Sequence, residues 1–441
     1  MLKKIENPNL STIDNKKIAE LFQNKSVQEM IQKSLSPYAH WEKIKHWQMP
    51  NGVNPIELWA VIKLVRSINK RVSVILDEKG KPFSWTSFLP GLSQFLHDVD
   101  MRLGGNLFLS GNQLDDEFQH RLLSRGVMEE AIASSQLEGA HTTRKVAKQI
   151  LLEKRKPKNK DEQMIVNNYE AMRLIEDELK NKELSEDILL FLHRVLTKNV
   201  LNEPETGRYR NDKDDIIVGD GIGEISHIPP KAEFVKKEIK KFINYANNEL
   251  KDFEFVHPVI KAIMLHFWIG YLHPFVDGNG RIARALFYWY LLREKYWAFG
   301  YIPLSKVIKN SPGQYGNAYV FSEQDDNDLT YFIAYNVDKI IQAIEEFDVY
   351  AERKWKENAY MAKLSRGKYK LNDRQIQLLR YYYKNKDATT SIKTHMKINE
   401  TSRITAMKDL KKLEDMKFVN SKKVGKTIYY YGTEKISELF N

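Results

Sequence analysis

The sequence predicts a mainly α-helical fold with one small β-hairpin in its middle and a second near its C-terminus. Apolar residues recur at helical spacing over long stretches, most clearly in 256–270 and 328–347. A Gly-Asp-Gly turn at 219–221 lies between two β-prone runs, which is typical of a hairpin. Three helical patterns between 373 and 418 precede a basic, glycine-containing hairpin at 419–431.

The composition indicates a globular protein with real apolar cores. The 441 residues suffice for two or three domains, and 42% of them are hydrophobic. No apolar run of about eighteen residues occurs, and the N-terminus lacks the apolar segment of a secretory signal, so we expect no membrane association. With no cysteine in the chain, disulfides, thiolate zinc sites and cysteine nucleophiles are excluded, and we expect a cytoplasmic protein.

Residues 1–112 read as an N-terminal helical extension without a catalytic motif. Helical patterns cover 16–23, 26–33 and 56–69, and a short hairpin is expected within 72–85. An aromatic cluster lies between the helical patterns, and we favour core packing over a ligand cage as its role. The cluster consists of Tyr38, His40, Trp41, His46 and Trp47.

A further helix is expected around 128–140, because apolar residues there end at Gly139, a favoured stop residue. Its last turn contains Ser134 and Glu138, a spacing that also recurs on helices by chance. The charged, proline-containing stretch 154–160 predicts a solvated connector.

Two amphipathic helices follow at 162–181 and 185–196, with Ser185 as the N-cap of the second. Arg208 and Arg210 come next, and a role at a site and a role in ion pairs are equally supported for both. The hairpin centred on the Gly-Asp-Gly turn then leads into a helix at 231–247.

The central motif runs from His273 to Arg284 with the sequence HPFVDGNGRIAR. The buried helix before it should end near Tyr271, and a second apolar helix should start at Arg281. Between these helices, Gly278, Asn279 and Gly280 can adopt positive φ and turn their N–H groups toward one point. Since unpaired N–H groups at a helix N-terminus bind anions, the motif predicts a phosphate site.

Charged side chains complete this predicted site. Arg281 and Arg284 are three residues apart, so they share a helical face and can grip phosphates. Asp277 offers a hard oxygen ligand that suits Mg²⁺ held jointly with a nucleotide. His273 is the one group in the motif that titrates near neutral pH and could take a proton from a hydroxyl.

The motif resembles the signature of the Fic family, His-x-Phe-x-Asp/Glu-Gly-Asn-Gly-Arg-x-x-Arg, at every defined position. The resemblance implies a Fic-type helical bundle and a nucleotidyltransferase that moves AMP from ATP to a Ser, Thr or Tyr hydroxyl of a protein. It assigns His273 as the base, Asp277 as the Mg²⁺ ligand and Phe275 as the loop anchor. The phosphate-binding residues implied are Gly278, Asn279, Gly280, Arg281 and, for the γ phosphate, Arg284.

Two other segments are similar to family features. Ser134 to Gly139 resembles the inhibitory motif Ser/Thr-x-x-x-Glu-Gly/Asn, which implies that Glu138 pairs with Arg284 in place of the γ phosphate. The hairpin resembles the flap that holds a target segment as an added strand. Its residues are Ile225, Ser226, His227 and Ile228, and we favour a flap contact or a bystander role for His227 over a second base.

Other sites are weaker or excluded. Leu304 to Tyr315 falls where such enzymes close over the nucleoside, but the match is loose and predicts no adenine contact. The Val424–Thr427 stretch lacks the first glycine of a P-loop, because Asn420 stands there. No His-Glu-x-x-His zinc pair occurs.

The C-terminal stretch resembles a winged helix at 371–441, joined by a charged helix or linker at 351–370. From Lys370 to Asn441 there are sixteen Lys and Arg against eight Asp and Glu, 16 − 8 = +8 of the total +11. DNA binding and a protein-docking or dimer role are equally supported. The candidate phosphate contacts are Arg403, Lys408, Lys411, Lys412, Lys422, Lys423 and Lys426.

The sequence therefore predicts an N-terminal extension (1–112), a catalytic domain (113–350), a linker (351–370) and a winged helix (371–441). The predicted activity is Mg²⁺- and ATP-dependent protein adenylylation, inhibited by Glu138. The protein itself is one candidate target, and DNA and a second copy of the chain are further candidate partners. The alternatives are an ATP-sensing DNA-binding regulator and an enzyme that removes AMP.

Overall fold

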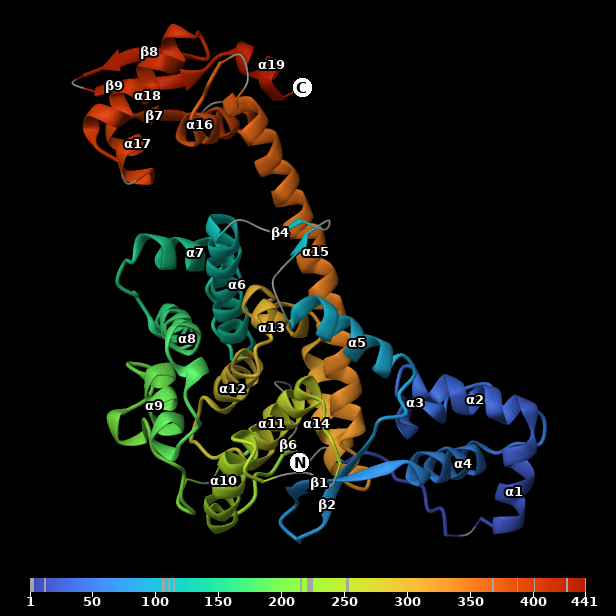
Figure 1. Cartoon of the computed structure of the whole chain (residues 1–441). Coiled ribbons are helices and arrows are strands. Elements are labelled where there is room, and N and C mark those ends of the chain that lie inside the picture. Colours follow the sequence, from blue (N-terminus) through green and yellow to red (C-terminus); the bar gives the residue numbers. More distant parts are fainter. Residues whose placement is uncertain are drawn as a thin grey trace. The chain divides into compact units, whose positions relative to one another are not determined.

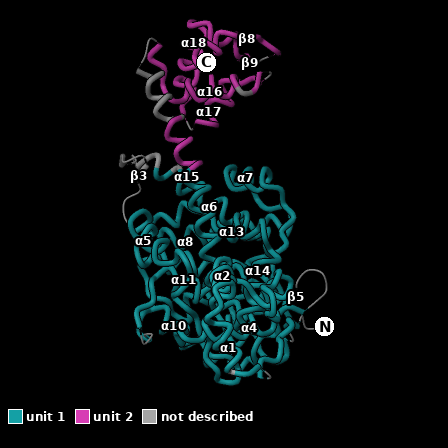
Figure 2. Tube along the Cα trace, turned by 90° about the vertical axis from the view of Figure 1, so that its right-hand side faces the viewer, with its two compact units in different colours: residues 1–348 teal, residues 349–441 magenta. Residues whose placement is uncertain are grey.

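The computed structural model divides into two compact units, 1–348 and 349–441 (Figure 2). Both units are mainly helical, and the described strands form three two-stranded sheets in unit 1 and one three-stranded sheet in unit 2, so the predicted fold class is confirmed (Figure 1). The described residues are 4–440 without 12, 105–107, 110, 111, 114, 115, 215, 220–224, 251–253, 367, 368, 387, 400 and 426.

Unit 1 begins with helices and a hairpin. These elements are α1 (Asn15–Gln23), α2 (Lys25–Leu35), α3 (Trp41–Ile44), α4 (Pro55–Ile68), β1 (Lys70–Leu76), β2 (Pro82–Thr86), α5 (Leu92–Leu103), β3 (Phe108–Leu109) and β4 (Asn112–Gln113). The next elements are α6 (Asp116–Leu137), α7 (Arg144–Glu153), α8 (Lys160–Asp177), η1 (Leu179–Asn181), α9 (Glu186–Thr197), η2 (Glu203–Glu205), β5 (Val218–Gly219), β6 (Ile225–His227) and α10 (Ala232–Ala246). The last are α11 (Pro258–Leu272), α12 (Asn279–Arg293), η3 (Trp297–Tyr301), α13 (Leu304–Ile308), α14 (Pro312–Gln324) and α15 (Thr330–Arg366), which continues into unit 2.

Helices α11 and α12 form the interior of unit 1 (Figure 1). In each helix, 13 of the 15 residues are buried. A helix that is apolar all round must be covered on every side, and α6, α8, α9 and α10 pack against this pair. The loop that joins α11 to α12 is consequently held at both ends by rigid, buried helices.

The N-terminal residues 4–104 pack into unit 1 rather than forming a unit of their own. Arg66 on α4 is buried and donates to the carbonyls of Ser34 and Ala39 at 2.8 and 2.9 Å. It also donates to the Tyr331 hydroxyl on α15 at 3.1 Å and lies 3.7 Å from the centre of the Tyr38 ring. His40 and Trp41 are buried, which confirms the predicted core-packing role for these two residues. Tyr38 is half-buried, packs on Tyr331 and also lines a cavity.

The predicted helices are present, with differences at some boundaries. Ser185 caps α9 as predicted, since its hydroxyl accepts from the Ile188 N–H at 3.2 Å. Helix α6 begins at Asp116, earlier than predicted. The prediction missed its first turns because polar residues such as His120 interrupt the apolar pattern there. Sequence reasoning missed α5 and α7, whose apolar stripes are short. Both predicted hairpins, β1–β2 and β5–β6, are confirmed, and the tip 220–224 of the second lies outside the described residues.

Unit 2 contains the three helices and the hairpin predicted for the C-terminal stretch. Its elements after α15 are α16 (Asp373–Lys384), β7 (Thr389–Ser391), α17 (Ile392–Ile398), α18 (Arg403–Asp415), β8 (Val419–Val424), β9 (Thr427–Gly432), η4 (Glu434–Ile436) and α19 (Ser437–Phe440). The strand order is β7-β9-β8, all antiparallel, and an apolar core lies between the sheet and the helices. Sequence reasoning missed β7. Among the described residues, no helix has both the length and the apolar composition of a membrane span.

Candidate active site

His273 ends helix α11 in a left-handed backbone conformation, with φ of 46°. This conformation is unfavourable for a residue with a Cβ and requires support from its surroundings. Arg210 supplies that support, because its Nε donates to the His273 carbonyl at 2.7 Å and its Nη2 donates to the Pro230 carbonyl. Of the two roles considered for Arg210, the structure favours the one at the site. Arg208 instead pairs with Asp214 at 2.7 Å.

The His273 side chain is arranged to accept a proton. Its Nδ1 lies 3.2 Å from the Gly270 carbonyl, and only a protonated Nδ1 can donate there, which leaves Nε2 with a lone pair. Burial of the ring, together with the nearby His227, lowers the pKa of His273 to about 4. The imidazole is therefore neutral near pH 7 and can act as a base.

The loop after His273 is fixed by side chains from two helices. The Asn279 side chain accepts from the Phe275 N–H at 2.9 Å and donates to the Phe275 carbonyl at 2.8 Å. Phe275 is fully buried and stacks on His193 of α9, with ring centres 3.8 Å apart. The side chain of Asn279 thus closes the loop. Its backbone N–H remains available to bind a phosphate.

His193 forms a second clamp that sequence reasoning missed. Its Nδ1 accepts from the Gly207 N–H at 2.9 Å, and its Nε2 lies 2.9 Å from the Asp277 carbonyl, to which it donates. Burial lowers the pKa of His193 to about 4, which keeps Nδ1 free to accept. The sequence signal was a histidine on the apolar side of an amphipathic helix, which does not distinguish this role from ordinary packing.

Helix α12 begins two residues earlier than predicted, at Asn279, with Gly278 as its N-cap. Positive φ, expected as accessible to 278–280, is adopted only by Gly278, at 88°. Asn279 and Gly280 lie within the first helical turn, where N–H groups have no intrahelical acceptor. The predicted cluster of N–H donors is thus produced by a helix N-terminus and one left-handed glycine.

The two arginines of the motif have different partners. Arg281 is fully buried, and it donates to the Leu196 carbonyl at 2.9 Å and to Oδ2 of Asp277 at 3.1 Å. Its guanidinium therefore braces the loop against α9, whereas its backbone N–H lies at the start of α12. The spacing of Arg281 and Arg284 predicts that both guanidinium groups grip phosphates together. In the structure the two groups face different partners and do not form one shared site.

Arg284 lies where α12 meets the end of α6. Its Nε donates to Oγ of Ser134 at 2.8 Å, and its Nη2 donates to Oε1 of Glu138 at 2.8 Å. Its Nη1 is buried and makes no hydrogen bond among the described residues. A buried guanidinium nitrogen without an acceptor, next to a helix N-terminus, fits an anionic group such as a phosphate.

Gly280, in the first turn of α12, faces the pair formed by Glu138 and Arg284. A Cβ at this position would collide with the Glu138 carboxylate and would lie 3.1 Å from Nη1 of Arg284. Only a residue without a side chain leaves room here for the carboxylate, or for an anion of similar size.

Glu138 follows directly after the end of α6. The helix stops at Leu137, Gly139 adopts φ of 93°, and the Ala140 N–H returns to the Ser135 carbonyl at 3.0 Å. This confirms the predicted stop at Gly139. The turn brings Glu138 and Ser134 to Arg284, although 146 residues separate Glu138 from Arg284.

The buried carboxylate of Glu130, on α6 about two turns before Glu138, holds this helix against the core. Glu130 accepts from the Tyr288 hydroxyl at 2.8 Å and from the Ser305 N–H at 2.9 Å. Burial raises the pKa of Glu130, in spite of these donors. This network, which sequence reasoning missed, joins α6 to α12 and α13, so that the position of Glu138 is set by the core.

The flap residue His227 is tied down on both ring nitrogens. Its Nδ1 lies 2.6 Å from the Glu323 carboxylate and its Nε2 lies 2.8 Å from the Tyr271 carbonyl. Burial lowers the pKa of His227, but the charge of Glu323 outweighs this effect and the net pKa is raised. With its ring centre 6.4 Å from that of His273, it fits a flap contact better than a second base. Ile225 and Ser226 are half-buried beside it, and Ile228 is exposed.

Asp277 is the candidate metal ligand. Its side chain is 49% exposed, and its Oδ1 accepts from the Gly278 N–H at 2.6 Å. Among the described residues, no group of three or more acidic or histidine side chains is arranged to hold a metal ion by itself. One accessible carboxylate beside a phosphate site fits Mg²⁺, which commonly takes one or two protein oxygens and completes its shell with phosphates and water.

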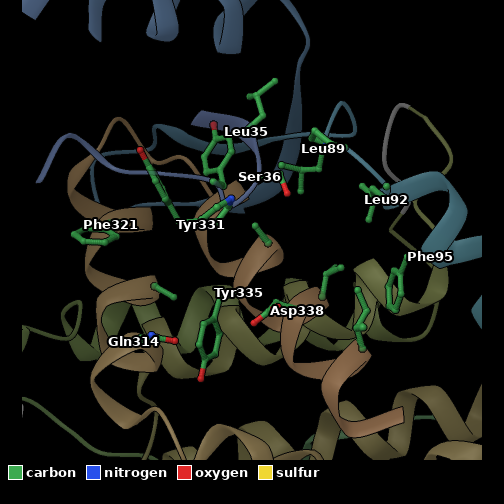
Figure 3. Close-up of a pocket in the computed structure, with 18 of the residues that line it drawn as sticks. Leu35, Ser36, Leu89, Leu92, Phe95, Gln314, Phe321, Tyr331, Tyr335 and Asp338 are labelled. Atoms are coloured by element: carbon green, nitrogen blue, oxygen red, sulfur yellow. The ribbon is translucent and has the colours of Figure 1, made fainter. Parts of the chain in front are cut away.

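A separate cavity of about 640 Å³ is lined by residues between 35 and 43, residues between 89 and 95, and residues of α14 and α15 (Figure 3). Phe95, Phe321 and Tyr335 contribute aromatic rings to its wall, and Asp338 contributes a carboxylate. None of the motif residues 273–284 lines it. The cavity is therefore distinct from the candidate active site.

The comparisons with known proteins agree with this geometry. Residues 183–291 match the Fic/DOC family. The chain is 32% identical over 126 residues to a protein adenylyltransferase Fic of Nematostella vectensis, covering 28% of this chain and 27% of that protein. It is 26% identical over 175 residues to the protein adenylyltransferase fic-1 of Caenorhabditis elegans, covering 39% of this chain and 31% of that protein. The aligned regions thus span less than a third of either relative.

Solved structures share the fold at low sequence identity. A Fic family protein from Desulfovibrio desulfuricans G20 has a TM-score of 0.52 and 19% identity, covering 79% of this chain and 98% of that one. The Fic-1 fragment of C. elegans has a TM-score of 0.50 and 17% identity, covering 76% and 87%. Residues 183–291 thus match a Fic domain in sequence, and the solved structures share the fold of the chain.

Proposed function

We propose that this protein transfers AMP from ATP to a hydroxyl side chain of a protein. The observation that carries the proposal is the meeting of three features in one loop: a neutral His273, the open N-terminus of α12, and Arg284 with its unpaired Nη1. Transfer of a phosphoryl-linked group requires a base for the attacking hydroxyl, N–H donors that hold the phosphates, and a cation that meets the terminal phosphate. The names of the relatives, protein adenylyltransferases, support the same activity.

In the proposed reaction, Nε2 of His273 takes the proton of the target hydroxyl. The hydroxyl oxygen forms a bond to the α phosphorus of ATP, the bond to the bridging oxygen breaks, and pyrophosphate leaves. The N–H groups of Asn279, Gly280 and Arg281 would hold the phosphates, and Arg284 would meet the γ phosphate. Mg²⁺, with Asp277 as its protein ligand, would neutralise phosphate charge when bound.

The ion pair between Glu138 and Arg284 is proposed to restrain this activity. A carboxylate and a γ phosphate would compete for the same guanidinium, because Arg binds either with similar geometry. With Glu138 in place, ATP would bind with its terminal phosphate displaced and its α phosphorus out of line.

The target segment is proposed to pair with the flap. Residues 225–228 present a short strand edge next to His273, and an extended peptide can add to such an edge by main-chain hydrogen bonds. This would place one side chain of the target near His273. The target protein is not specified by this geometry, and the chain itself is one candidate.

Intact-mass spectrometry tests the proposal. Glu138→Gly protein incubated with Mg²⁺ and ATP should gain the mass of one AMP moiety, about 329 Da, on itself or on a target added as lysate protein. The His273→Ala, Glu138→Gly double variant is the control and should gain nothing. Unchanged ATP binding with no transfer to any protein would contradict the proposal.

Two other activities remain as candidates. Glu138 lies beside the phosphate site and could orient a water molecule, which favours AMP removal as a second reaction. An ATP-sensing regulator would bind DNA through unit 2 and would keep that binding after His273→Ala. A cytoplasmic location and a dimer of this chain also remain proposals.

A further inference from the structure

The net positive charge of the chain comes entirely from unit 2. Residues 349–441 contain 22 Lys and Arg against 10 Asp and Glu, 22 − 10 = +12. Residues 1–348 contain the other 47 basic and 48 acidic residues, 47 − 48 = −1. Such a division favours a polyanionic partner for unit 2 in particular, because a merely solubilising charge needs no such segregation.

We propose that unit 2 binds duplex DNA, with helix α18 in the major groove and the β8–β9 hairpin against the neighbouring backbone. This inference goes beyond the transfer reaction and does not depend on it. It commits the C-terminal unit to one of the two roles that the sequence left open.

Helix α18 presents a continuous exposed stripe of cationic and aliphatic side chains, which suits contact with DNA. Arg403, Ile404, Met407, Lys408 and Lys411 are all exposed, at positions that follow one face of the helix. Three of them are cationic, and none of the ion pairs between described residues engages these three cations. They are therefore available to phosphates.

The acidic residues of α18 are kept away from this stripe. Asp409 is buried and accepts from Arg374 at 2.7 Å and from Asn372 at 2.7 Å. Glu414 is half-buried and accepts from the Ser421 hydroxyl at 2.5 Å. Only Asp415, at the C-terminal end of the helix, is exposed. The first two turns of α18 thus carry no exposed negative charge.

The aliphatic members of the stripe also fit a groove. Ile404 is 63% exposed and Met407 is 46% exposed, near the N-terminus of α18. In helix-turn-helix proteins the N-terminal residues of the recognition helix reach the base edges, where apolar side chains contact thymine methyl groups. Ile404 and Met407 would thus contact bases, while the cations on either side of them would contact phosphates.

The hairpin adds a second basic surface. Lys422 and Lys423 on β8 are exposed and lie opposite Tyr429 and Ile428 on β9. Gly425 turns the strand with φ of 62°. Helix α18 packs against β8, so both basic surfaces belong to one compact body. The major groove of DNA admits an α-helix, and a basic hairpin beside that helix can contact the flanking phosphates.

DNA is favoured over the other polyanions and over a second copy. The major groove of duplex RNA is too deep and narrow to admit a helix. Two copies of a unit with +12 formal charge repel each other, whereas association with DNA releases counterions. Charge therefore favours a nucleic acid over a second copy of the chain, and groove shape favours duplex DNA over duplex RNA.

Fluorescence anisotropy of the full chain with a labelled random-sequence 24-base-pair duplex tests this proposal. Binding should weaken steeply between about 50 and 200 mM salt, with a slope of about −0.9 per phosphate contacted. The variant Arg403→Gln, Lys408→Gln, Lys411→Gln should reduce the magnitude of the slope by about 3 and weaken binding at least about tenfold. His273→Ala should leave both quantities unchanged, which separates this proposal from the transfer reaction.

A matched control carries the same charge change elsewhere. Lys236, Lys237 and Lys240 are exposed on α10 of unit 1, and their replacement by Gln should leave the slope unchanged. Circular dichroism should show native helix content in both triple variants. The pair Ile404→Ala, Met407→Ala should keep the salt slope and relax the preferences found by selection from random duplexes.

Several outcomes would overturn the proposal. They are no salt-dependent binding to the duplex, equal weakening by the α10 control, and equal competition by duplex RNA or single-stranded DNA. Sedimentation velocity provides another test that could overturn the proposal. If the chain formed a dimer that Ile404→Ala, Met407→Ala dissociated, the stripe on α18 would be a protein interface.

Discussion

Nη2 of Arg284 donates to Oε1 of Glu138 at 2.8 Å, and this pair joins the end of α6 to the first turns of α12. The Arg284 side chain is almost fully buried, whereas that of Glu138 is 24% exposed. The acid can therefore leave the pair more easily than the arginine can. Displacement of Glu138 would leave Arg284 in place, because Nε and Nη2 still donate to the Ser134 hydroxyl and carbonyl. Nη1 and the second N–H of Nη2 would then be free for a phosphate.

Glu138→Gly should raise transfer and lower stability together. Loss of the acid opens the phosphate position, but it leaves a buried guanidinium with less compensation, which costs about 3 kcal/mol. We expect at least about tenfold faster transfer and a lower melting temperature that Mg²⁺ and ATP restore. Differential scanning fluorimetry and a transfer assay measure the two effects. Glu138→Gln, which keeps the volume, is the control, and equal activity in all three proteins would refute the inhibitory role.

Transfer should depend on pH through His273. Its pKa is lowered to about 4 by burial, so the neutral base is fully present above about pH 5 and is lost as the pH falls through 4. We expect the transfer rate of Glu138→Gly protein to be level from about pH 5.5 to 8, with an acid limb near pH 4. A limb near pH 6.5, the ordinary histidine value, would show that the ring is not held neutral in this way.

His193→Phe should slow transfer without unfolding the protein. Phenylalanine can keep the stack on Phe275, but it removes the hydrogen bonds to Gly207 and Asp277 that hold the loop. Loss of such supporting contacts typically costs about 10- to 100-fold in activity. We expect a lower kcat and a raised Mg²⁺ requirement in the Glu138→Gly background. His193→Gln, which can replace one hydrogen bond, should recover part of the rate, and a purely structural role would lower stability alone.

Gly280→Ala should weaken nucleotide binding even after Glu138 is removed. The added methyl group would lie 3.1 Å from Nη1 of Arg284, where a phosphate oxygen would have to sit. In the Glu138→Gly background we expect about a tenfold weaker affinity for ATP, or about 1.4 kcal/mol. Isothermal titration calorimetry measures this. Gly316→Ala is a control, since a Cβ there meets no atom within 4 Å.

The sequence by itself determined the composition of the site. Twelve consecutive residues contain the proposed base, the proposed phosphate-binding turn and both arginines, and their order is a local property that needs no tertiary information. Helical periodicity likewise located α11 and α12, because a helix buried on all sides must be apolar along its whole length. The stop at Gly139 was also local, since a left-handed residue ends a helix through its own backbone freedom.

Tertiary structure decided what each of these residues faces. Spacing placed Arg281 and Arg284 on one side of a helix, but Arg281 turns to the Leu196 carbonyl and Arg284 to α6, because each meets a different neighbouring element. Arg210 and His193, which support the loop, and Glu130, which positions the end of α6, come from segments far from the motif. Single buried polar residues have no periodic signal. Their roles arise from the hydrogen bonds that burial requires, and those partners are set only when the helices pack.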